Sequence, residues 1–303
     1  ALIRSLNIPT VKILEDVGVT WAVDYAKRLG VFSPLNADLS LGLGSSSLTL
    51  YEMTKAFSHF GRLGRRMRPL IVKKVVDQSG KTILENLTLD SRFEREIGDS
   101  EAMLRTRMEV LKKHPPFARS VAQTGVEPGP PYTSSIIFDD ANQLIRPQTA
   151  YLMTTILSGA INEEGATGGK ARALGRSVAG KTGSTNNYFD GWFIGYTPQI
   201  ATGVWVGYDE EKSLGLGEVG GDTALPIWVE YMKVAHEDLP AQDFSVPPGI
   251  VFANIDGQTG NLASASSSSV VRQAFIEGTE PKTLSGSPSS VDDTEFLKKD
   301  LTE

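Results

Sequence analysis

The chain has 303 residues, a formal net charge of −6, and a composition of 40% hydrophobic and 22% charged residues. That length allows one large domain of ordinary globular composition. The acidic balance argues against a nucleic-acid surface, which would need clustered Lys and Arg. Cysteine is absent and only three histidines occur, so disulfides are excluded and neither a metal site nor a bound cofactor is expected. No apolar run reaches the roughly 18–20 residues that cross a bilayer.

Helical periodicity dominates the first third of the chain. Apolar spacing predicts two helices within residues 8–30, separated by Gly18, and a third over residues 48–60. Two β-rich stretches, 70–76 and 82–84, flank a Ser-Gly turn and predict a hairpin.

The composition changes over residues 86–146, which we interpret as an insertion. Its first part predicts an amphipathic helix, capped by Asp99 or Ser100 and stopped by Pro115-Pro116. The apolar face of that helix comprises Ile97, Leu104, Met108 and Leu111.

The second half of the chain mixes helices with short strands. Residues 147–161 predict a helix opened by proline, and residues 192–196 and 201–208 predict a β-hairpin. Residues 224–236 predict a last helix. Its expected buried face comprises Ile227, Tyr231 and Val234. Helices and antiparallel strands without βαβ alternation indicate an α+β fold.

We place the domain at residues 1–238 and a C-terminal extension at 239–303. Pro, Gly, Ser and acidic residues dominate the extension, so we expect it to be partly disordered, above all at 264–269 and 286–293.

Several chemistries are disfavoured by the motifs. None of the three histidines lies near a Gly-x-Ser-x-Gly elbow, a motif that is missing here, so a Ser-His-Asp triad is not expected. Gly215, Gly217 and Gly220 match a dinucleotide fingerprint, but they follow an antiparallel hairpin. We therefore interpret them as a loop before the last helix.

The most informative motif is Lys181-Thr182-Gly183-Ser184. On a strand edge, the lysine directs a positive charge into a cleft, while the glycine lets a substrate approach the backbone. Backbone N–H groups there can stabilise an oxyanion. The hydroxyls of Thr182 and Ser184 can bind a carboxylate beside the lysine charge. A glycine turn between strands is the simpler structural alternative.

This motif and its surroundings resemble the transpeptidase domain of class A (bifunctional) penicillin-binding proteins. The core of the resemblance is residues 172–187, and the tract 190–198 (Asp-Gly-Trp-Phe-Ile-Gly-Tyr-Thr-Pro) extends it. Ser5-Leu6-Asn7 is similar to the family's Ser-x-Asn element, and the resemblance covers nearly all of 1–85 and 147–282. It implies a penicillin-binding/β-lactamase-like fold with a central antiparallel sheet flanked by helices.

The resemblance also implies roles for individual residues. Ser5 would pass a proton between nucleophile and leaving amine, Lys181 would hold that hydroxyl in a positive field, and Asn7 would hold the substrate's amide. The N–H of Ser184 would be one oxyanion donor. The terminal carboxylate of a D-alanyl-D-alanine stem peptide, or of a β-lactam, would contact Thr182, Ser184 and Thr185, with Gly183 leaving room for it.

One family element is missing: no Ser-x-x-Lys occurs in the 303 residues. We expect the nucleophile on an N-terminal portion of the same protein, and the isolated chain to be inactive. That portion would also anchor the protein at the extracytoplasmic face of the bacterial cytoplasmic membrane. Two alternatives stay open: a non-catalytic scaffold of the same fold, and a D,D-carboxypeptidase or serine β-lactamase.

Overall fold

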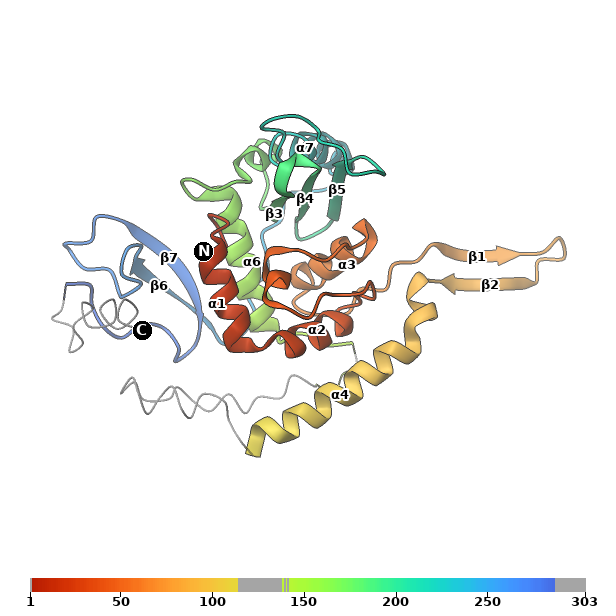
Figure 1. The fold of residues 1–303 in the computed structure, drawn as a ribbon, viewed down its shortest axis with the longest axis horizontal. Coiled ribbons are helices and arrows are strands. Elements are labelled where there is room, and N and C mark those ends of the chain that lie inside the picture. The colour runs from red at the N-terminus through yellow and green to blue at the C-terminus, as the bar shows by residue number, and fades with distance from the viewer. Residues whose placement is uncertain (1, 114–137, 139, 141, 287–303) are drawn as a thin grey trace. The chain divides into compact units, whose positions relative to one another are not determined.

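The computed structural model describes residues 2–113, 138, 140 and 142–286, and Figure 1 shows their fold. The chain divides into two compact units after Pro248, rather than after residue 238 as the sequence suggested. The helices of the first unit are α1 (Asn7–Val17), α2 (Val19–Arg28), α3 (Leu50–Gly61), α4 (Glu94–Lys113), α6 (Pro147–Asn162) and α7 (Ala224–Ala235). Its strands are β1 (Val72–Val76), β2 (Thr82–Leu87), β3 (Ala179–Ser184), β4 (Asp190–Tyr196) and β5 (Ala201–Gly207), and the expected α+β class is confirmed.

Local sequence signals explain where the N-terminal helices begin and end. Gly18 separates α1 from α2 with a φ of 90°, a conformation that favours glycine. A capping box between Thr49 and Glu52 opens α3. The predicted cap of α4 at Asp99 or Ser100 was wrong, because the helix already begins at Glu94. The buried hydroxyl of Ser100 donates instead to the backbone oxygen of Asp24, at 3.1 Å.

The centre of the first unit is an antiparallel sheet in the order β3-β4-β5. Helix α7 packs on one face of the sheet, while α3 and α6 pack on the other. On the α7 side, Phe193 and Trp228 meet edge to face, with ring centroids 5.0 Å apart. On the α6 side, the hydroxyls of Tyr196 and Thr154 lie 2.9 Å apart in a buried hydrogen bond. The sheet therefore contacts a helix on each of its two faces through these side chains.

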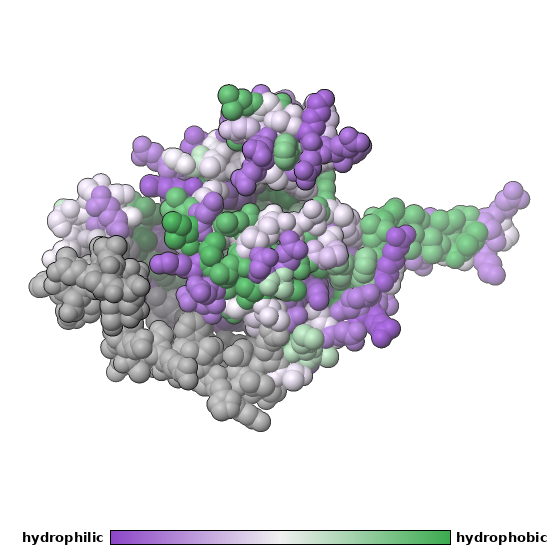
Figure 2. All heavy atoms as spheres, in the orientation of Figure 1, coloured by the Kyte–Doolittle hydropathy of each residue, from purple (hydrophilic) through white to green (hydrophobic). Residues whose placement is uncertain are grey.

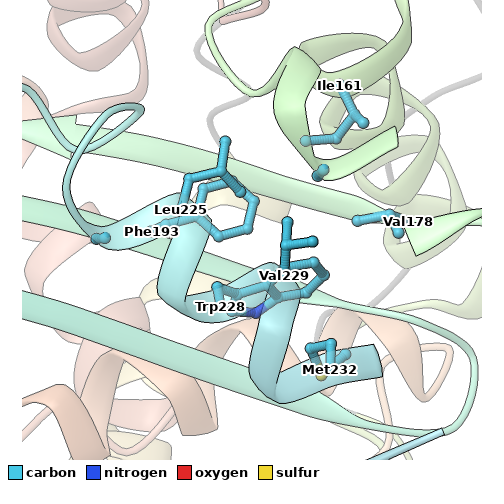
Figure 3. Packing of buried hydrophobic residues seen from close by; sticks show 9 residues of the cluster. Ile161, Val178, Phe193, Leu225, Trp228, Val229 and Met232 are labelled. Carbon is cyan, nitrogen blue, oxygen red and sulfur yellow. The ribbon is translucent and has the colours of Figure 1, made fainter. Parts of the chain in front are cut away.

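The buried face of α7 is not the one that the sequence predicted. Leu225, Trp228 and Met232 are fully buried against the sheet (Figure 3). Ile227, Tyr231 and Val234 are 54%, 58% and 73% exposed. The helix has two apolar faces at helical spacing, and only one of them meets the sheet.

The expected insertion, 86–146, is anchored to the core at both ends of its described part. The side chain of Lys55 on α3 forms an ion pair with Asp90 at 2.6 Å, and Phe93 stacks on Phe32. At the far end, Leu144 and Ile145 are buried and their N–H groups donate to the backbone oxygen of Gly64. The predicted helix stop at Pro115-Pro116 and the side chains of Met108 and Leu111 lie outside the described residues.

The predicted hairpin at residues 70–84 is confirmed as β1 and β2, and it is exposed on both faces. Figure 2 shows hydrophobic side chains along it. The large apolar residues exposed there are Leu70, Ile71, Val75, Val76, Ile83, Leu84 and Leu87.

The second unit contains a β-hairpin, although the C-terminal extension was expected to be partly disordered, and residues 264–269 lie between its two strands. Strands β6 (Ile250–Asp256) and β7 (Val270–Ile276) pair antiparallel along their whole length. The carboxylate of Asp256 accepts hydrogen bonds from the N–H groups of Gln258 and Thr259 and from the hydroxyl of Ser285. A hydrogen bond from the Ser267 side chain, together with those from Gln258 and Ser285, lowers the pKa of Asp256 to about 2. The segment 287–293, also expected to be disordered, lies outside the described residues.

Candidate active site

The Lys-Thr-Gly motif lies on β3, which is an outer strand of the central sheet. Its register is fixed, because Lys181 pairs with Ile194 and Gly183 pairs with Trp192. Alternation along a strand puts Lys181 and Gly183 on one face of the sheet and Thr182 and Ser184 on the other. The ammonium group of Lys181 nevertheless reaches the hydroxyl side of this edge, since its Nζ atom lies 3.5 Å from Thr182 Oγ1.

Ser5 and Lys181 meet, although they are far apart in the sequence. The Lys181 Nζ atom donates a hydrogen bond to Ser5 Oγ and another to the backbone oxygen of Thr182, at 2.9 Å. Ser5 has a φ of 52°, a left-handed conformation that is uncommon for serine. Partial burial lowers the pKa of Lys181. An amine with a lowered pKa beside a hydroxyl is suited to proton transfer.

The two hydroxyls on the other side are each held by a second residue. Thr182 Oγ1 lies 2.6 Å from Thr167 Oγ1, in the loop that follows α6. Ser184 Oγ accepts a hydrogen bond from the N–H of Gly220 at 2.9 Å. The loop 215–220, as expected, precedes the last helix, and here it also contacts the motif.

Glycines make these contacts possible. A side chain on Gly220 would collide with the backbone oxygens of Gly183 and Trp192. A side chain on Gly183 would crowd Trp192, with Cβ atoms 3.2 Å apart. The strand edge and the loop therefore approach each other closely only because both positions lack a Cβ.

Two other predicted site residues have different surroundings. Asn7 is the exposed first residue of α1, two positions after Ser5. Thr185 closes the turn between β3 and β4, since its hydroxyl accepts a hydrogen bond from the N–H of Asp190 at 2.8 Å. The described residues contain no cluster of three or more His, Asp and Glu side chains suited to a metal ion.

Sequence reasoning did not single out Thr167 or Gly220 as site residues. Thr167 lies in a short Gly-Ala-Thr-Gly segment whose partner is 15 positions away. Gly220 belongs both to the rejected nucleotide motif and to a Gly-Gly pair that resembles the family, but neither pattern gives it a role in the site. Nothing in either local pattern predicts which strand these residues contact.

Comparisons with known proteins identify the family to which the chain belongs. The family model for the penicillin binding protein transpeptidase domain matches residues 1–213, and a model for the penicillin-binding protein 1A C-terminal domain matches residues 246–288. Penicillin-binding protein 1A of Pseudomonas aeruginosa is 32% identical over 95% of this chain and 35% of its own length. The Aquifex aeolicus protein of the same name is 34% identical over 93% of this chain and 31% of its own length.

A crystal structure of penicillin-binding protein 1A from Haemophilus influenzae superposes with a TM-score of 0.68 at 27% identity. The match covers 93% of this chain and 40% of that structure. The chain belongs to the penicillin-binding protein transpeptidase family. It spans about a third of the length of the curated relatives that it matches. In the part of the chain that the structure describes, no helix is both long and apolar enough to cross a membrane.

Proposed function

We propose that this chain forms one wall of a D,D-transpeptidase site, which cross-links peptidoglycan stem peptides through a serine acyl-enzyme. The observation that carries the proposal is the hydrogen bond between Lys181 and Ser5, on the edge of the central sheet. The attacking serine would come from a Ser-x-x-Lys segment in an N-terminal portion of the same protein. We place the activity in the bacterial cell envelope, at the extracytoplasmic face of the cytoplasmic membrane.

Each residue then has a chemical task. The missing serine attacks the carbonyl of the penultimate D-alanine, its oxygen bonds to that carbon, and the C–N bond to the terminal D-alanine breaks. Ser5 passes the serine's proton to the leaving amine, with Lys181 holding its hydroxyl in place. Asn7 holds the substrate's amide, and the N–H of Ser184 stabilises the oxyanion. An acceptor amine then attacks the ester and releases the serine.

The carboxylate of the terminal D-alanine, or of a β-lactam, would lie beside the other side of the motif. Thr182 and Ser184 would donate hydrogen bonds to it in the positive field of Lys181, and Thr185 would lie at the end of the same edge. Gly183 keeps this approach open.

An open strand edge and an exposed apolar helix face in the first unit support the proposal that an N-terminal portion packs against it. Within the described residues, β5 has a strand neighbour on one side only. The adjacent helix α7 exposes Ile227, Tyr231 and Val234. An exposed apolar stripe next to an open strand edge is typical of a surface that another segment covers.

Labelled penicillin tests the proposal. The complete protein should form a covalent adduct, and Lys181→Ala should lower the acylation rate by orders of magnitude, on the order of 10²-fold or more. Lys233→Ala is the matched control, because Lys233 is exposed and forms an ion pair with Glu230 on the surface of α7, at 2.7 Å. A covalent adduct on a serine of the isolated chain would overturn the idea that the nucleophile lies elsewhere.

The scaffold alternative predicts a different result. In that case Lys181→Ala would leave the protein's partner binding intact and there would be no penicillin adduct to lose. A carboxypeptidase or β-lactamase would form the adduct but release it to water rather than to an amine. Product analysis with an added acceptor amine separates these cases.

A further inference from the structure

The loop between α6 and the 3₁₀ helix η3 (Gly169–Leu174) places one exposed side chain on the motif strand. The N–H of Gly168 donates to the backbone oxygen of Ala160 at 3.0 Å, and a Cβ on Gly168 would lie 2.9 Å from that oxygen. Ala166 donates in the same way to the backbone oxygen of Glu163, at 3.2 Å. The backbone is thus fixed on both sides of Thr167, although its side chain is exposed.

Thr167 is also confined from the side. A Cβ on Gly221 would lie 3.1 Å from the backbone oxygen of Thr167 and 3.7 Å from the methyl group of Thr182. Both threonines are β-branched, which restricts the rotation of each side chain about χ1. Their hydroxyls lie 2.6 Å apart in an exposed hydrogen bond, and the backbone of Gly221 lies beside both residues.

The hydrogen bonds also set the directions in which protons point. A hydroxyl has one proton to donate and two lone pairs. Ser184 Oγ accepts from the N–H of Gly220, so its proton stays available for a ligand. The hydroxyl proton of Thr182 is available to a ligand only when Thr167 is the donor in their hydrogen bond. A carboxylate accepts hydrogen bonds and cannot donate, so its presence selects that direction.

We propose that Thr167 is a positioning residue, which donates to Thr182 and so directs the Thr182 hydroxyl at the free carboxylate of the substrate. The inference rests on the proposed transpeptidase function and adds a specificity determinant to it. It predicts that Thr167 matters for ligands with a free carboxylate. For ligands whose carboxylate is esterified, the acylation constant should not depend on Thr167.

The experiment compares Thr167→Val with wild type in the complete protein, using labelled penicillin and its methyl ester. Valine keeps the shape of the side chain and removes the donor. We expect the second-order acylation constant for the free acid to fall about tenfold, through weaker binding rather than slower acylation at saturation. The constant for the ester should stay unchanged, and Thr167→Ser should restore the free-acid value.

Thr155→Val is the matched control, since the Thr155 hydroxyl donates within α6 to the backbone oxygen of Leu152 at 2.8 Å. It should leave the ratio of free acid to ester unchanged. An unchanged ratio in Thr167→Val would overturn the proposal. So would an equal loss for acid and ester, which would indicate general damage to the site. If wild type forms no adduct with either compound, the transpeptidase assignment itself fails and this inference with it.

Discussion

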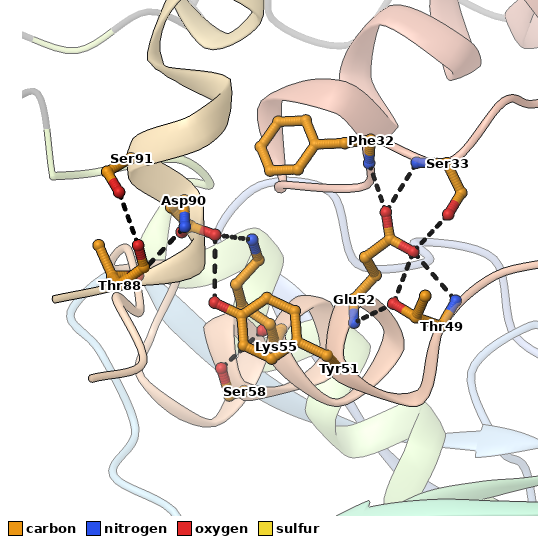
Figure 4. A network of polar contacts seen from close by, with 10 residues as sticks. All are labelled: Phe32, Ser33, Thr49, Tyr51, Glu52, Lys55, Ser58, Thr88, Asp90 and Ser91. Atoms are coloured by element: carbon orange, nitrogen blue, oxygen red, sulfur yellow. Dashed lines mark hydrogen bonds and ion pairs between the residues drawn. The ribbon is translucent and has the colours of Figure 1, made fainter. Parts of the chain in front are cut away.

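Glu52 is a buried carboxylate whose hydrogen bonds connect the start of α3 to the chain segment that follows α2. Replacing it should destabilise the protein at this point. Its Oε1 atom accepts hydrogen bonds from the N–H groups of Phe32 and Ser33, both at 2.7 Å (Figure 4). Its Oε2 atom accepts from the hydroxyl of Ser33 at 2.7 Å and from the N–H of Thr49 at 3.0 Å. The side chain is only 5% exposed. Such a carboxylate is suited to its site only while it is ionised.

The pKa of Glu52 gives the magnitude. Burial raises this pKa, but the hydrogen bonds from Ser33 and Thr49 outweigh burial and lower it from 4.5 to about 2. That difference corresponds to about 3 kcal/mol in favour of the ionised folded state. In Glu52→Gln one oxygen becomes an NH₂ group that faces N–H donors. We therefore expect the variant to lose about 3 kcal/mol of unfolding free energy at pH 7.

Urea unfolding and hydrogen exchange measure this loss. The amides of Phe32 and Ser33 should exchange about 100-fold faster in Glu52→Gln, as long as they exchange through opening of this region. Because the folded-state pKa is depressed, the contribution of Glu52 is fully present above about pH 4.5. This contribution disappears as the pH falls towards 2. The difference in unfolding free energy between wild type and Glu52→Gln should therefore become smaller in acid.

Glu230→Gln serves as the control, because Glu230 is exposed on α7 and forms a surface ion pair with Lys233. It should change the unfolding free energy by less than about 0.5 kcal/mol. A loss of unfolding free energy below about 1 kcal/mol for Glu52→Gln would refute the reasoning. So would a difference in unfolding free energy between wild type and variant that is the same at pH 7 and in acid.

Three further predictions follow from buried or crowded groups. Burial, together with the charge of Lys55, lowers the pKa of His59 from 6.5 to about 4. The free energy of unfolding should therefore fall by about 3 kcal/mol as the pH drops from 6.5 to about 4. In His59→Phe, the melting temperature should depend less steeply on pH over the same range. Lys55→Met should cost about 3 kcal/mol in urea unfolding, because it leaves the carboxylate of Asp90 without its counter-ion; adding Asp90→Asn should recover part of the loss, and no recovery would contradict this account. Gly220→Ala forces a Cβ into the backbone of the motif strand and should lower acylation by labelled penicillin, whereas Glu218→Ala, in the exposed part of the same loop, should not.

Much of the fold could be predicted from local patterns. Gly18 marks the break between α1 and α2, and the proline at the start of α6 marks the first residue of that helix. The hairpin predicted at 192–196 and 201–208 follows from β-branched and aromatic residues, and the two strands do pair antiparallel. These signals depend on neighbours in the sequence, which is why a single sequence contains them.

The errors concern choices that only tertiary contacts decide. Helix α7 carries Ile227, Tyr231 and Val234 on one face and Leu225 and Trp228 on another, and both sets have helical spacing. Composition cannot say which face meets the sheet. The hairpin of the second unit was missed because serines separate its strands and hide a short alternating pattern.

The same distinction applies to the site. The sequence resemblance predicted that Ser5 and Lys181 share one cleft, and the structure brings them into contact. The partners of Thr182 and Ser184 come from two loops, at Thr167 and Gly220, whose positions depend on close backbone packing. No pattern of residue types encodes a distance between two loops.

The contact between Lys181 and Ser5 also has a consequence for how the molecule folds. It joins residues 176 positions apart in the chain. Closing a flexible loop of that length costs about 5 kcal/mol of chain entropy, and one hydrogen bond does not offset it. The helices and the sheet must assemble first, and their packing must hold the two ends together. During refolding, we expect this pair to form late, after helical and strand signals have returned, so that a chain with a misfolded core never presents the Lys181–Ser5 pair to a substrate.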